Sequence, residues 1–250
     1  MVSGLRPDDD GDSMRLSMRI AYGHCFAAVE GLRQLFVRSL VLGIAGGMLM
    51  TASASAQAPA DKPIKLVVLG DSLSAGLGVP ADAAFPARLQ KALRDKGMAV
   101  DIVNAGVSGD TTSGGLARLD WSVADGTQAA ILELGANDAL RGIDPKIAHD
   151  ALAQILARLK ARGVAVLLCG MLAPPNYGEQ YSAQFDAIYP DLAKQFQVPL
   201  YPFFLQGVAG DTRLNQADGM HPTPEGVDII VKAILPSVEA LLGAKSGQRS

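Results

Sequence analysis

Cysteine and histidine are scarce in this chain of 250 residues, which has two cysteines and three histidines. Cys25 lies near the amino terminus, and Cys169 lies in the apolar run VAVLLCG. A zinc site needs several cysteine, histidine or carboxylate side chains at short spacing, and the sequence has no such cluster. We therefore expect no metal site and no internal disulfide in the main body of the chain. Cys169 is predicted to be a buried thiol in the core.

Runs of positive charge are also absent. The chain has 22 Lys and Arg residues against 25 Asp and Glu residues, a formal net charge of −3 at pH 7. Proteins that bind nucleic acids or anionic membranes gather Lys and Arg on one surface, so neither partner is expected. The glycine-rich stretch GDSLSAGLG at 70–78 matches neither GxGxxG nor GxxxxGKS/T, the patterns of nucleotide-binding loops. A small neutral or anionic molecule remains as the expected partner, with no cofactor.

The longest apolar run near the amino terminus has only 13 residues, Leu40–Ala52. A helix that spans a bilayer needs about 20, so a transmembrane anchor is disfavoured. Arg38 precedes the run and the small residues ASASAQ follow it, an order typical of a secretory signal peptide. The sequence predicts cleavage between Ala56 and Gln57, a periplasmic or secreted product, and no stable membrane insertion after cleavage.

The first residues fit this leader poorly, because DDDGD at 8–12 is acidic where a signal peptide begins with basic residues. A start downstream of Met1, which would make the first residues a spurious extension, is the alternative to a long leader. The expected organisation is leader and extension at 1–56, a Pro/Ala-rich linker at 57–63, one folded domain at 64–243 and a tail at 244–250.

Five short apolar runs rich in β-branched residues alternate with segments of helical length. The runs lie at 64–69, 100–104, 129–134, 164–169 and, more weakly, 198–202. Apolar residues at helical spacing predict helices within 85–97 and 145–163, and a last helix after Pro224. Strands that are apolar throughout and alternate with helices indicate a parallel sheet covered on both faces. The expected fold class is α/β with a mostly parallel five-stranded sheet.

Ser72 follows the first predicted strand in the stretch VVLGDSLSAGLG. In one interpretation the stretch is an ordinary turn from strand to helix, with Asp71 or Ser72 as the helix cap. In the other, Ser72 is a nucleophile at the carboxyl end of a parallel strand, where open α/β sheets place their sites.

His221, in DGMHP, is the candidate base for this serine, with Asp218 three residues before it. A carboxylate at that spacing can accept a hydrogen bond from one ring nitrogen and leave the other to take the serine proton. A cap of the following helix is the alternative role for Asp218.

Two further strand ends offer hydrogen-bond donors. The second strand ends in NAGVSGDT, where Gly106 and Gly109 can present backbone N–H groups to a cavity, and Asn137, in GAND, follows the third strand. Acyl transfer requires donors aimed at the developing oxyanion. Glycine and asparagine are also common in turns, but their places at successive strand ends favour one shared site. The adjacent Asp110 and Asp138 are predicted to stabilise turns rather than bind a metal.

These residues carry a resemblance to a known family. GDSLS, SGDT, GAND and DGMHP, in this order, resemble the four sequence blocks of the SGNH branch of the GDSL hydrolases, and within it the TesA-like thioesterases, lysophospholipases and arylesterases. The resemblance implies a flavodoxin-like three-layer α/β/α sandwich. It also implies Ser72 as the nucleophile, His221 as the base and Asp218 as its orienting partner. The oxyanion hole would combine the N–H groups of Ser72 and Gly109 with the Asn137 side chain.

The loop after the fourth strand, GMLAPPNYGEQYSAQF, carries apolar residues in a connection that would otherwise be polar. Met171, Leu172 and Tyr177, with Leu73 beside the serine, are predicted to line a groove for an acyl chain. A loop folded onto the domain for packing is the alternative. The expected function is an exported serine esterase or thioesterase acting on small acyl esters or thioesters through an acyl-enzyme. A carbohydrate O-deacetylase of the same fold and a non-catalytic acyl- or lipid-binding protein are the alternative functions.

Overall fold

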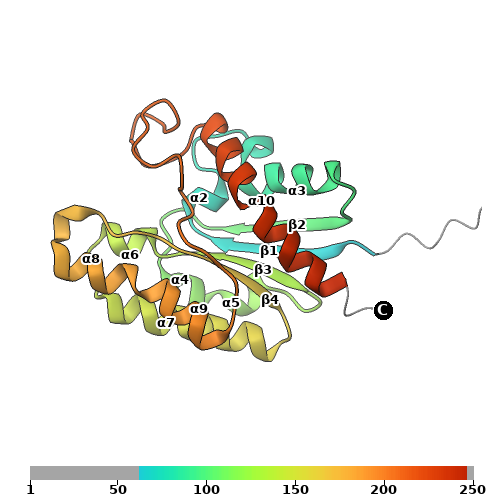
Figure 1. Cartoon of the computed structure of the whole chain (residues 1–250), viewed down its shortest axis with the longest axis horizontal. Coiled ribbons are helices and arrows are strands. Elements are labelled where there is room, and N and C mark those ends of the chain that lie inside the picture. Colours follow the sequence, from blue (N-terminus) through green and yellow to red (C-terminus); the bar gives the residue numbers. More distant parts are fainter. Residues whose placement is uncertain (1–61, 247–250) are drawn as a thin grey trace, which may run out of the picture. The chain divides into compact units, whose positions relative to one another are not determined.

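A five-stranded parallel sheet forms the centre of the domain (Figure 1). The computed structural model describes residues 62–246. Its strands are β1 (Ile64–Gly70), β2 (Val100–Gly106), β3 (Ala129–Glu133), β4 (Ala165–Cys169) and β5 (Leu200–Tyr201). Their order is β2-β1-β3-β4-β5, and every neighbouring pair is parallel. This is the flavodoxin-like order, so the predicted fold class is confirmed.

Helices cover both faces of the sheet and complete three layers (Figure 1). One face carries α3 (Phe85–Asp95) and α10 (Pro224–Ser246), which pack against each other. The other face carries α4 (Thr112–Ala117), α5 (Leu119–Ser122), α7 (Pro145–Ala161) and α9 (Ile188–Phe196). The shorter helices are α2 (Ser72–Ala75), α6 (Ala136–Leu140) and α8 (Glu179–Asp186), with 3₁₀ turns at Ala81–Ala83 and Pro175–Tyr177. Within residues 62–246, no helix has both the length and the apolar character that crossing a bilayer requires.

Burial of the strands follows their place in the sheet. Every residue of β3 is buried, and β1 is buried at all positions except Lys65, because helices cover both faces of these inner strands. At the edge, β2 is buried only at Val100. Cys169, at the end of β4, is fully buried and free, which confirms its prediction as a core thiol.

The carboxyl ends of three strands meet at one edge of the sheet. Gly70 at the end of β1 pairs in register with Gly106 of β2 on one side and with Glu133 of β3 on the other. The segments that follow these residues therefore leave the sheet side by side. A crevice between such segments is where open parallel sheets bind their ligands.

The observed elements differ from the predicted ranges mainly near their ends. β5 is shorter than the predicted 198–202, because Pro199 has no N–H to donate and Pro202 follows directly. α10 runs past the predicted domain boundary at 243 to Ser246. The predicted leader at 1–56, positions 57–61 of the predicted linker and positions 247–250 of the predicted tail lie outside the described residues.

Candidate active site

Ser72 is the first residue of α2, directly after the β1 turn residue Asp71. Asp71 caps this helix, and its Oδ1 accepts the N–H of Leu73 at 3.0 Å. Gly76 caps the end of this helix, and its φ of 84° lies in the region that favours glycine. The stretch is thus a capped turn, and the same turn places the Ser72 hydroxyl at the carboxyl edge of the sheet.

Three side chains that lie far apart along the sequence form a continuous hydrogen-bond chain. Ser72 Oγ lies 2.8 Å from His221 Nε2, across 149 positions of sequence. His221 Nδ1 lies 2.6 Å from Asp218 Oδ2. An ionised Asp218 requires Nδ1 to carry the proton, so Nε2 is left to accept the Ser72 hydroxyl proton.

Asp218 is held as a carboxylate by its own turn. Its Oδ1 accepts the backbone N–H groups of Met220 at 2.9 Å and His221 at 3.0 Å. These two bonds, followed by the bond from the His221 ring, lower the pKa of Asp218 to about 2. The carboxylate therefore fixes both the position and the tautomer of the imidazole.

Gln216 fastens the His221 loop to the rest of the domain. Its backbone N–H donates to the His221 carbonyl at 2.8 Å. Its side-chain Nε2 donates to the carbonyls of Leu77 at 2.8 Å and Pro222 at 3.0 Å. Because Leu77 follows α2, this one side chain ties the histidine loop to the segment that carries the serine.

Asn137 lies on α6, the helix that follows β3, and its side chain is oriented by Asp71. Asn137 Nδ2 donates to Asp71 Oδ2 at 3.1 Å. An amide nitrogen has two hydrogens, so a second one remains for another acceptor. The backbone N–H of Ser72 lies at the first position of α2, where N–H groups have no acceptor within the helix and are free to bind another group.

Gly109 lies in the loop between β2 and α4 with a φ of 81°, and its carbonyl accepts Arg141 Nη2 at 2.8 Å. A side chain at this φ would be strained, so the position suits glycine. The peptide N–H of Gly109 is the group that the family resemblance implies for the oxyanion hole.

A second carboxylate, Glu133 at the end of β3, is completely buried beneath this turn. Its Oε2 accepts the Ser74 hydroxyl at 2.5 Å and the Asp71 N–H at 3.3 Å, and its Oε1 has no partner among the described residues. Burial, assisted by the charge of Asp71, raises the pKa of Glu133 well above its ordinary range. Burial also raises the pKa of Asp71, to about 6.

A cavity of about 410 Å³ opens beside Ser72, Asn137 and His221. Its other walls are almost entirely apolar and come from four segments of the chain. They are Leu73, Ala136, Ala139, Leu140, Met171, Leu172, Ala173, Pro174, Phe203, Leu205, Ala209, Gly210, Asn215, Gly219 and Met220. The arrangement places a serine–histidine pair against a surface that suits a hydrocarbon chain.

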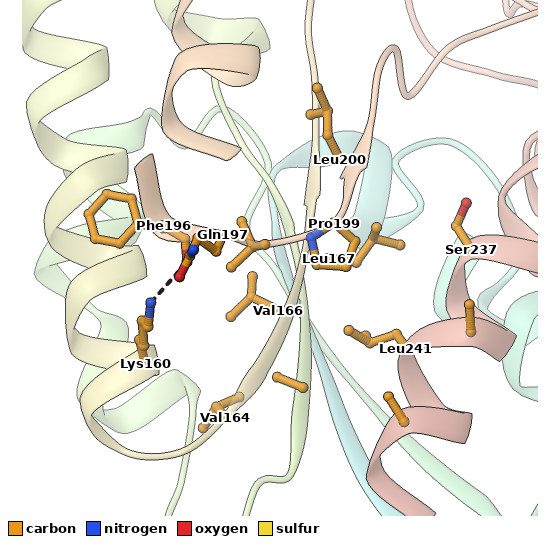
Figure 2. A pocket seen from close by; sticks show the side chains of 14 residues that line it. Lys160, Val164, Val166, Leu167, Phe196, Gln197, Pro199, Leu200, Ser237 and Leu241 are labelled. Atoms are coloured by element: carbon orange, nitrogen blue, oxygen red, sulfur yellow. Dashed lines mark hydrogen bonds between the residues drawn. The ribbon is translucent and has the colours of Figure 1, made fainter. Parts of the chain in front are cut away.

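Another cavity, of about 490 Å³, lies beside β4 and β5, between the end of α9 and α10 (Figure 2). Aliphatic side chains such as Val166, Leu167 and Leu241 line it, and its one ammonium group, on Lys160, donates to the Phe196 carbonyl at 3.0 Å. This cavity has no nucleophile paired with a base. Of these two cavities, only the one beside Ser72 has the groups that acyl transfer requires.

Residues 68–229 match the family described as GDSL-like Lipase/Acylhydrolase. The chain belongs to this family. The hydrolase is 40% identical over 208 residues to Esterase TesA of Pseudomonas aeruginosa, covering 82% of this chain and 100% of that relative. It is 45% identical over 162 residues to the Arylesterase of Vibrio mimicus, covering 64% of this chain and 81% of the relative. It is also 41% identical over 182 residues to Thioesterase 1/protease 1/lysophospholipase L1 of Escherichia coli, covering 72% and 86%.

Solved structures agree with the sequence relatives. The crystal structure of TesA matches this GDSL hydrolase with a TM-score of 0.68 at 41% identity, over 71% of this chain and 99% of that one. AlinE4, described as an SGNH-hydrolase family esterase, matches with a TM-score of 0.61 at 44% identity, over 72% and 97%. The resemblance inferred from the four sequence blocks is thereby confirmed.

The groove residues expected from the sequence fall into two groups in the hydrolase. Leu73, Met171 and Leu172 line the Ser72 cavity. Tyr177 does not line it, because its hydroxyl donates to the Leu140 carbonyl at 2.8 Å and its ring packs against Tyr181. Tyr177 therefore contacts the backbone of a wall residue, Leu140, and does not line the cavity itself. Gly109 also lies outside the set of lining residues.

Sequence reasoning missed several walls of this cavity. Phe203 and Leu205 follow β5, and Leu140 ends α6. The apolar run FFL directly after the last predicted strand was a usable signal, because it leaves the sheet at the same carboxyl edge as Ser72.

Both aspartates considered as metal ligands are engaged within the protein. Asp110 Oδ2 accepts Arg118 Nε at 2.6 Å. Asp138 accepts the Thr112 hydroxyl at 2.7 Å and the Thr112 N–H at 2.9 Å. In the described part of the chain, no group of three or more His, Cys, Asp or Glu residues is arranged to hold a metal ion.

Proposed function

We propose that this GDSL hydrolase cleaves carboxylic esters or acyl thioesters through an acyl-enzyme on Ser72. The observation that carries the proposal is the pair of contacts at His221, 2.8 Å to Ser72 Oγ and 2.6 Å to Asp218 Oδ2. The names of the relatives, esterase, arylesterase and thioesterase, support the same class of substrate. No cofactor takes part in this reaction.

In the first half of the reaction, Ser72 Oγ attacks the carbonyl carbon while His221 Nε2 takes its proton. Asp218 stabilises the imidazolium that forms. The oxyanion accepts hydrogen bonds from the N–H groups of Ser72 and Gly109 and from the Asn137 side chain. The carbon–oxygen or carbon–sulfur bond then breaks, and His221 gives its proton to the leaving alcohol or thiol.

In the second half, water replaces the leaving group. His221 takes a proton from this water, whose oxygen attacks the acyl carbon. Collapse of the second tetrahedral intermediate breaks the bond to Ser72, which regains a proton from His221. The products are the free acid and the unmodified enzyme.

An acyl chain fits the cavity better than a sugar does. Leu140, Leu172 and Met220 line it and are 48%, 48% and 46% exposed, so apolar surface lies open at the site. Clustered exposed apolar side chains mark a binding surface. A carbohydrate deacetylase would need polar groups for sugar hydroxyls, and a non-catalytic acyl-binding protein would need no base oriented by a carboxylate.

Covalent labelling with an alkyl fluorophosphonate, together with ester turnover, tests the proposal. We expect the label on Ser72, and loss of both labelling and turnover in Ser72→Ala and in His221→Ala. Ser237→Ala, on α10 and outside the Ser72 cavity, is the matched control and should keep both. Wild-type turnover by a folded Ser72→Ala variant would reject the assignment. A panel of acyl thioesters, aryl esters, lysophospholipids and acetylated sugars then separates the esterase from the deacetylase.

A further inference from the structure

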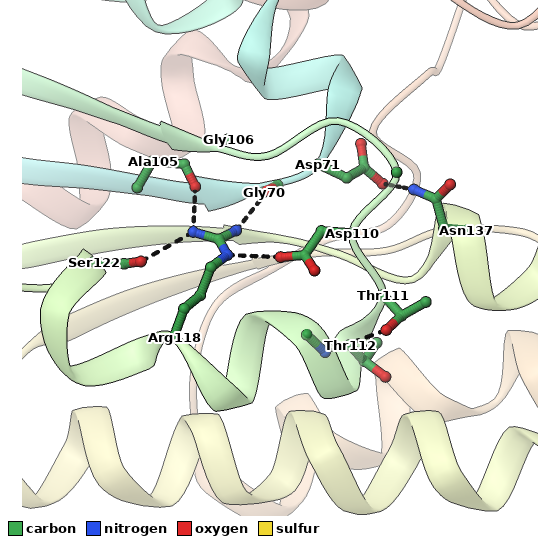
Figure 3. Close-up of polar contacts among 12 residues, drawn as sticks. Gly70, Asp71, Ala105, Gly106, Asp110, Thr111, Thr112, Arg118, Ser122 and Asn137 are labelled. Carbon is green, nitrogen blue, oxygen red and sulfur yellow. Dashed lines mark hydrogen bonds and ion pairs between the residues drawn. The ribbon is translucent and has the colours of Figure 1, made fainter.

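Arg118 is a buried arginine whose three guanidinium nitrogens all donate hydrogen bonds (Figure 3). Nε donates to Asp110 Oδ2 at 2.6 Å, and Nη2 donates to the Gly70 carbonyl at 2.8 Å. Nη1 donates to the Ala105 carbonyl at 2.8 Å and to the Ser122 hydroxyl at 3.0 Å. Burying a guanidinium is costly unless it is fully paired, so the position of this side chain is tightly defined.

The acceptors of Arg118 lie next to the groups of the candidate oxyanion hole. Gly70 ends β1, two residues before Ser72, and its carbonyl also accepts the Val107 N–H at 3.1 Å. Asp110 directly follows Gly109. The guanidinium therefore joins the backbone that carries the serine to the loop that carries the Gly109 N–H.

Two other contacts join the segment of Asn137 to the same part of the site. Thr112, at the start of α4, binds Asp138 through its N–H and its hydroxyl, and Asp138 directly follows Asn137. Asn137 in turn binds Asp71 at 3.1 Å. Each of the three oxyanion donors is thus adjacent to a residue that is fixed by a hydrogen bond to another segment of the site.

We propose that Arg118 is a positioning residue for acyl transfer, which holds the Gly109 N–H in register with the Ser72 N–H. The inference rests on the proposed function, in which Ser72 is the nucleophile and Gly109 an oxyanion donor. Arg118 does not line the Ser72 cavity, so it acts without touching substrate. Its contribution is realised in the transition state, because that is when the oxyanion forms.

Lysine cannot replace this arginine. Its single ammonium keeps the charge, but it cannot reach acceptors on β1, β2 and the Asp110 loop in the directions that a planar fork reaches. Misplacing a donor by about 1 Å costs on the order of 10²-fold in rate. We expect Arg118→Lys to lower kcat by about 10- to 100-fold, with KM within about twofold of the wild type.

The matched control is Arg162→Lys. Arg162 is partly buried and, like Arg118, donates to a backbone carbonyl, through Nη2 to that of Val123. It directly follows α7, at the amino ends of the strands and away from Ser72. The experiment measures kcat, KM, melting temperature and inhibition by an alkyl boronic acid, which forms a tetrahedral adduct on the serine. All rates are taken at a temperature where each variant is folded.

The proposal requires that Arg118→Lys lose kcat and boronic acid affinity together, whereas Arg162→Lys loses at most melting temperature. It also requires that Asp110→Asn, which keeps an oxygen acceptor for Nε, retain more kcat than Asp110→Ala. Arg118→Lys with wild-type kcat and boronic acid affinity would overturn it, as would a loss expressed only in KM. Turnover that survives in Ser72→Ala would instead overturn the proposed function, so the two failures are distinguishable.

Discussion

The Asp71 carboxylate links Asn137 to the helix of the serine: Oδ2 accepts Asn137 Nδ2 at 3.1 Å, and Oδ1 accepts the Leu73 N–H at 3.0 Å. One buried side chain therefore orients the amide of α6 and caps α2. Because both contacts use the same rigid carboxylate, the amide and the Ser72 N–H are held in a fixed relation before substrate arrives. Such preorganisation is what makes hydrogen-bond donors effective on an oxyanion.

Replacement of Asn137 by alanine should reduce kcat by about 10²- to 10³-fold with a small change in KM, the loss typical of one oxyanion donor. Steady-state kinetics on an aryl ester measure the split. Asn176→Ala, in the exposed 3₁₀ turn at Pro175–Tyr177, is the control and should behave as wild type. A loss that falls entirely on KM would make Asn137 a substrate-binding residue instead.

The rate of ester hydrolysis should decrease on the acid side of the pH–rate profile. Protonation of Nε2 prevents the ring from accepting the Ser72 proton, so kcat/KM should fall as the pH decreases. Asp218 does not contribute to this fall near neutral pH, because its hydrogen bonds from His221 and Met220 hold its pKa at about 2. Rates measured from about pH 5 to 9 check the direction. A rate that increases on acidification would exclude histidine as the base.

Stability should depend on pH through Glu133. Its pKa in the folded protein is raised well above the ordinary 4.5, chiefly by burial. As the pH rises above 4.5, the unfolded chain releases this proton while the folded protein keeps it, so the free energy of unfolding decreases. Burial of Asp71, whose pKa is raised to about 6, acts in the same direction.

Glu133→Gln, which resembles the protonated acid in shape, should therefore gain stability relative to the wild type as the pH is raised. Urea unfolding at a series of pH values measures the difference, and Glu179→Gln, in the first turn of α8, is the surface control. Parallel stability curves for wild type and Glu133→Gln would show that Glu133 ionises in the folded protein as it does in the unfolded chain.

The preference of the enzyme for acyl chain length should depend more on Leu172 than on Tyr177. Each buried CH₂ contributes about 0.8 kcal/mol, so medium chains should be preferred to acetyl by roughly tenfold per added pair of buried carbons. Leu172→Ser removes a residue that lines the cavity and should flatten this profile while sparing acetyl-ester turnover. Tyr177→Ser removes the hydroxyl that donates to the Leu140 carbonyl, and it should change the chain-length profile less than Leu172→Ser does. Preference of the wild type for acetyl esters, unchanged by Leu172→Ser, would favour the deacetylase.

The predicted export and cleavage of the leader can be tested by intact-mass measurement. The ASASAQ sequence after the apolar run predicts that expression in a Gram-negative host yields an envelope protein that begins at or near Gln57. Intact-mass measurement on the envelope fraction determines the first residue. A product that still carries residues 1–56 would contradict cleavage.

The sequence predicted the fold through its apolar runs because three of them, those of β1, β3 and β4, are strands buried almost throughout. The run of β2 lies at the edge of the sheet and is buried only at Val100. The runs at 64–69, 100–104 and 129–134 became β1, β2 and β3 with bounds shifted by two residues or fewer. Ser72 was singled out because it follows the end of the first strand, and His221 because it directly precedes the start of the last helix. The separate helices α8 and α9 were not predicted, since the segment 179–196 has no terminal glycine between them and contains Pro190.

Arg118 and Glu133 could not be recognised from sequence. An arginine in a helical segment is ordinarily exposed. The carbonyl groups that pair with the buried Arg118 belong to the backbone of β1 and β2, which are distant in sequence. Glu133 looks like a polar residue at the end of a strand, and only the packing of Ser74 and Asp71 against it reveals its burial. Both roles arise from tertiary contacts between segments distant along the chain.

The 149 positions between Ser72 and His221 also set the time at which the enzyme becomes active during its synthesis. The serine leaves the ribosome early, with β1, whereas the histidine loop is made much later and, within residues 62–246, directly precedes α10. A nascent or truncated chain that lacks this end holds a serine without a base. Hydrolysis therefore begins only after the histidine loop has been synthesised and has packed against Ser72, so enzymatic activity reports that these two distant segments have come together.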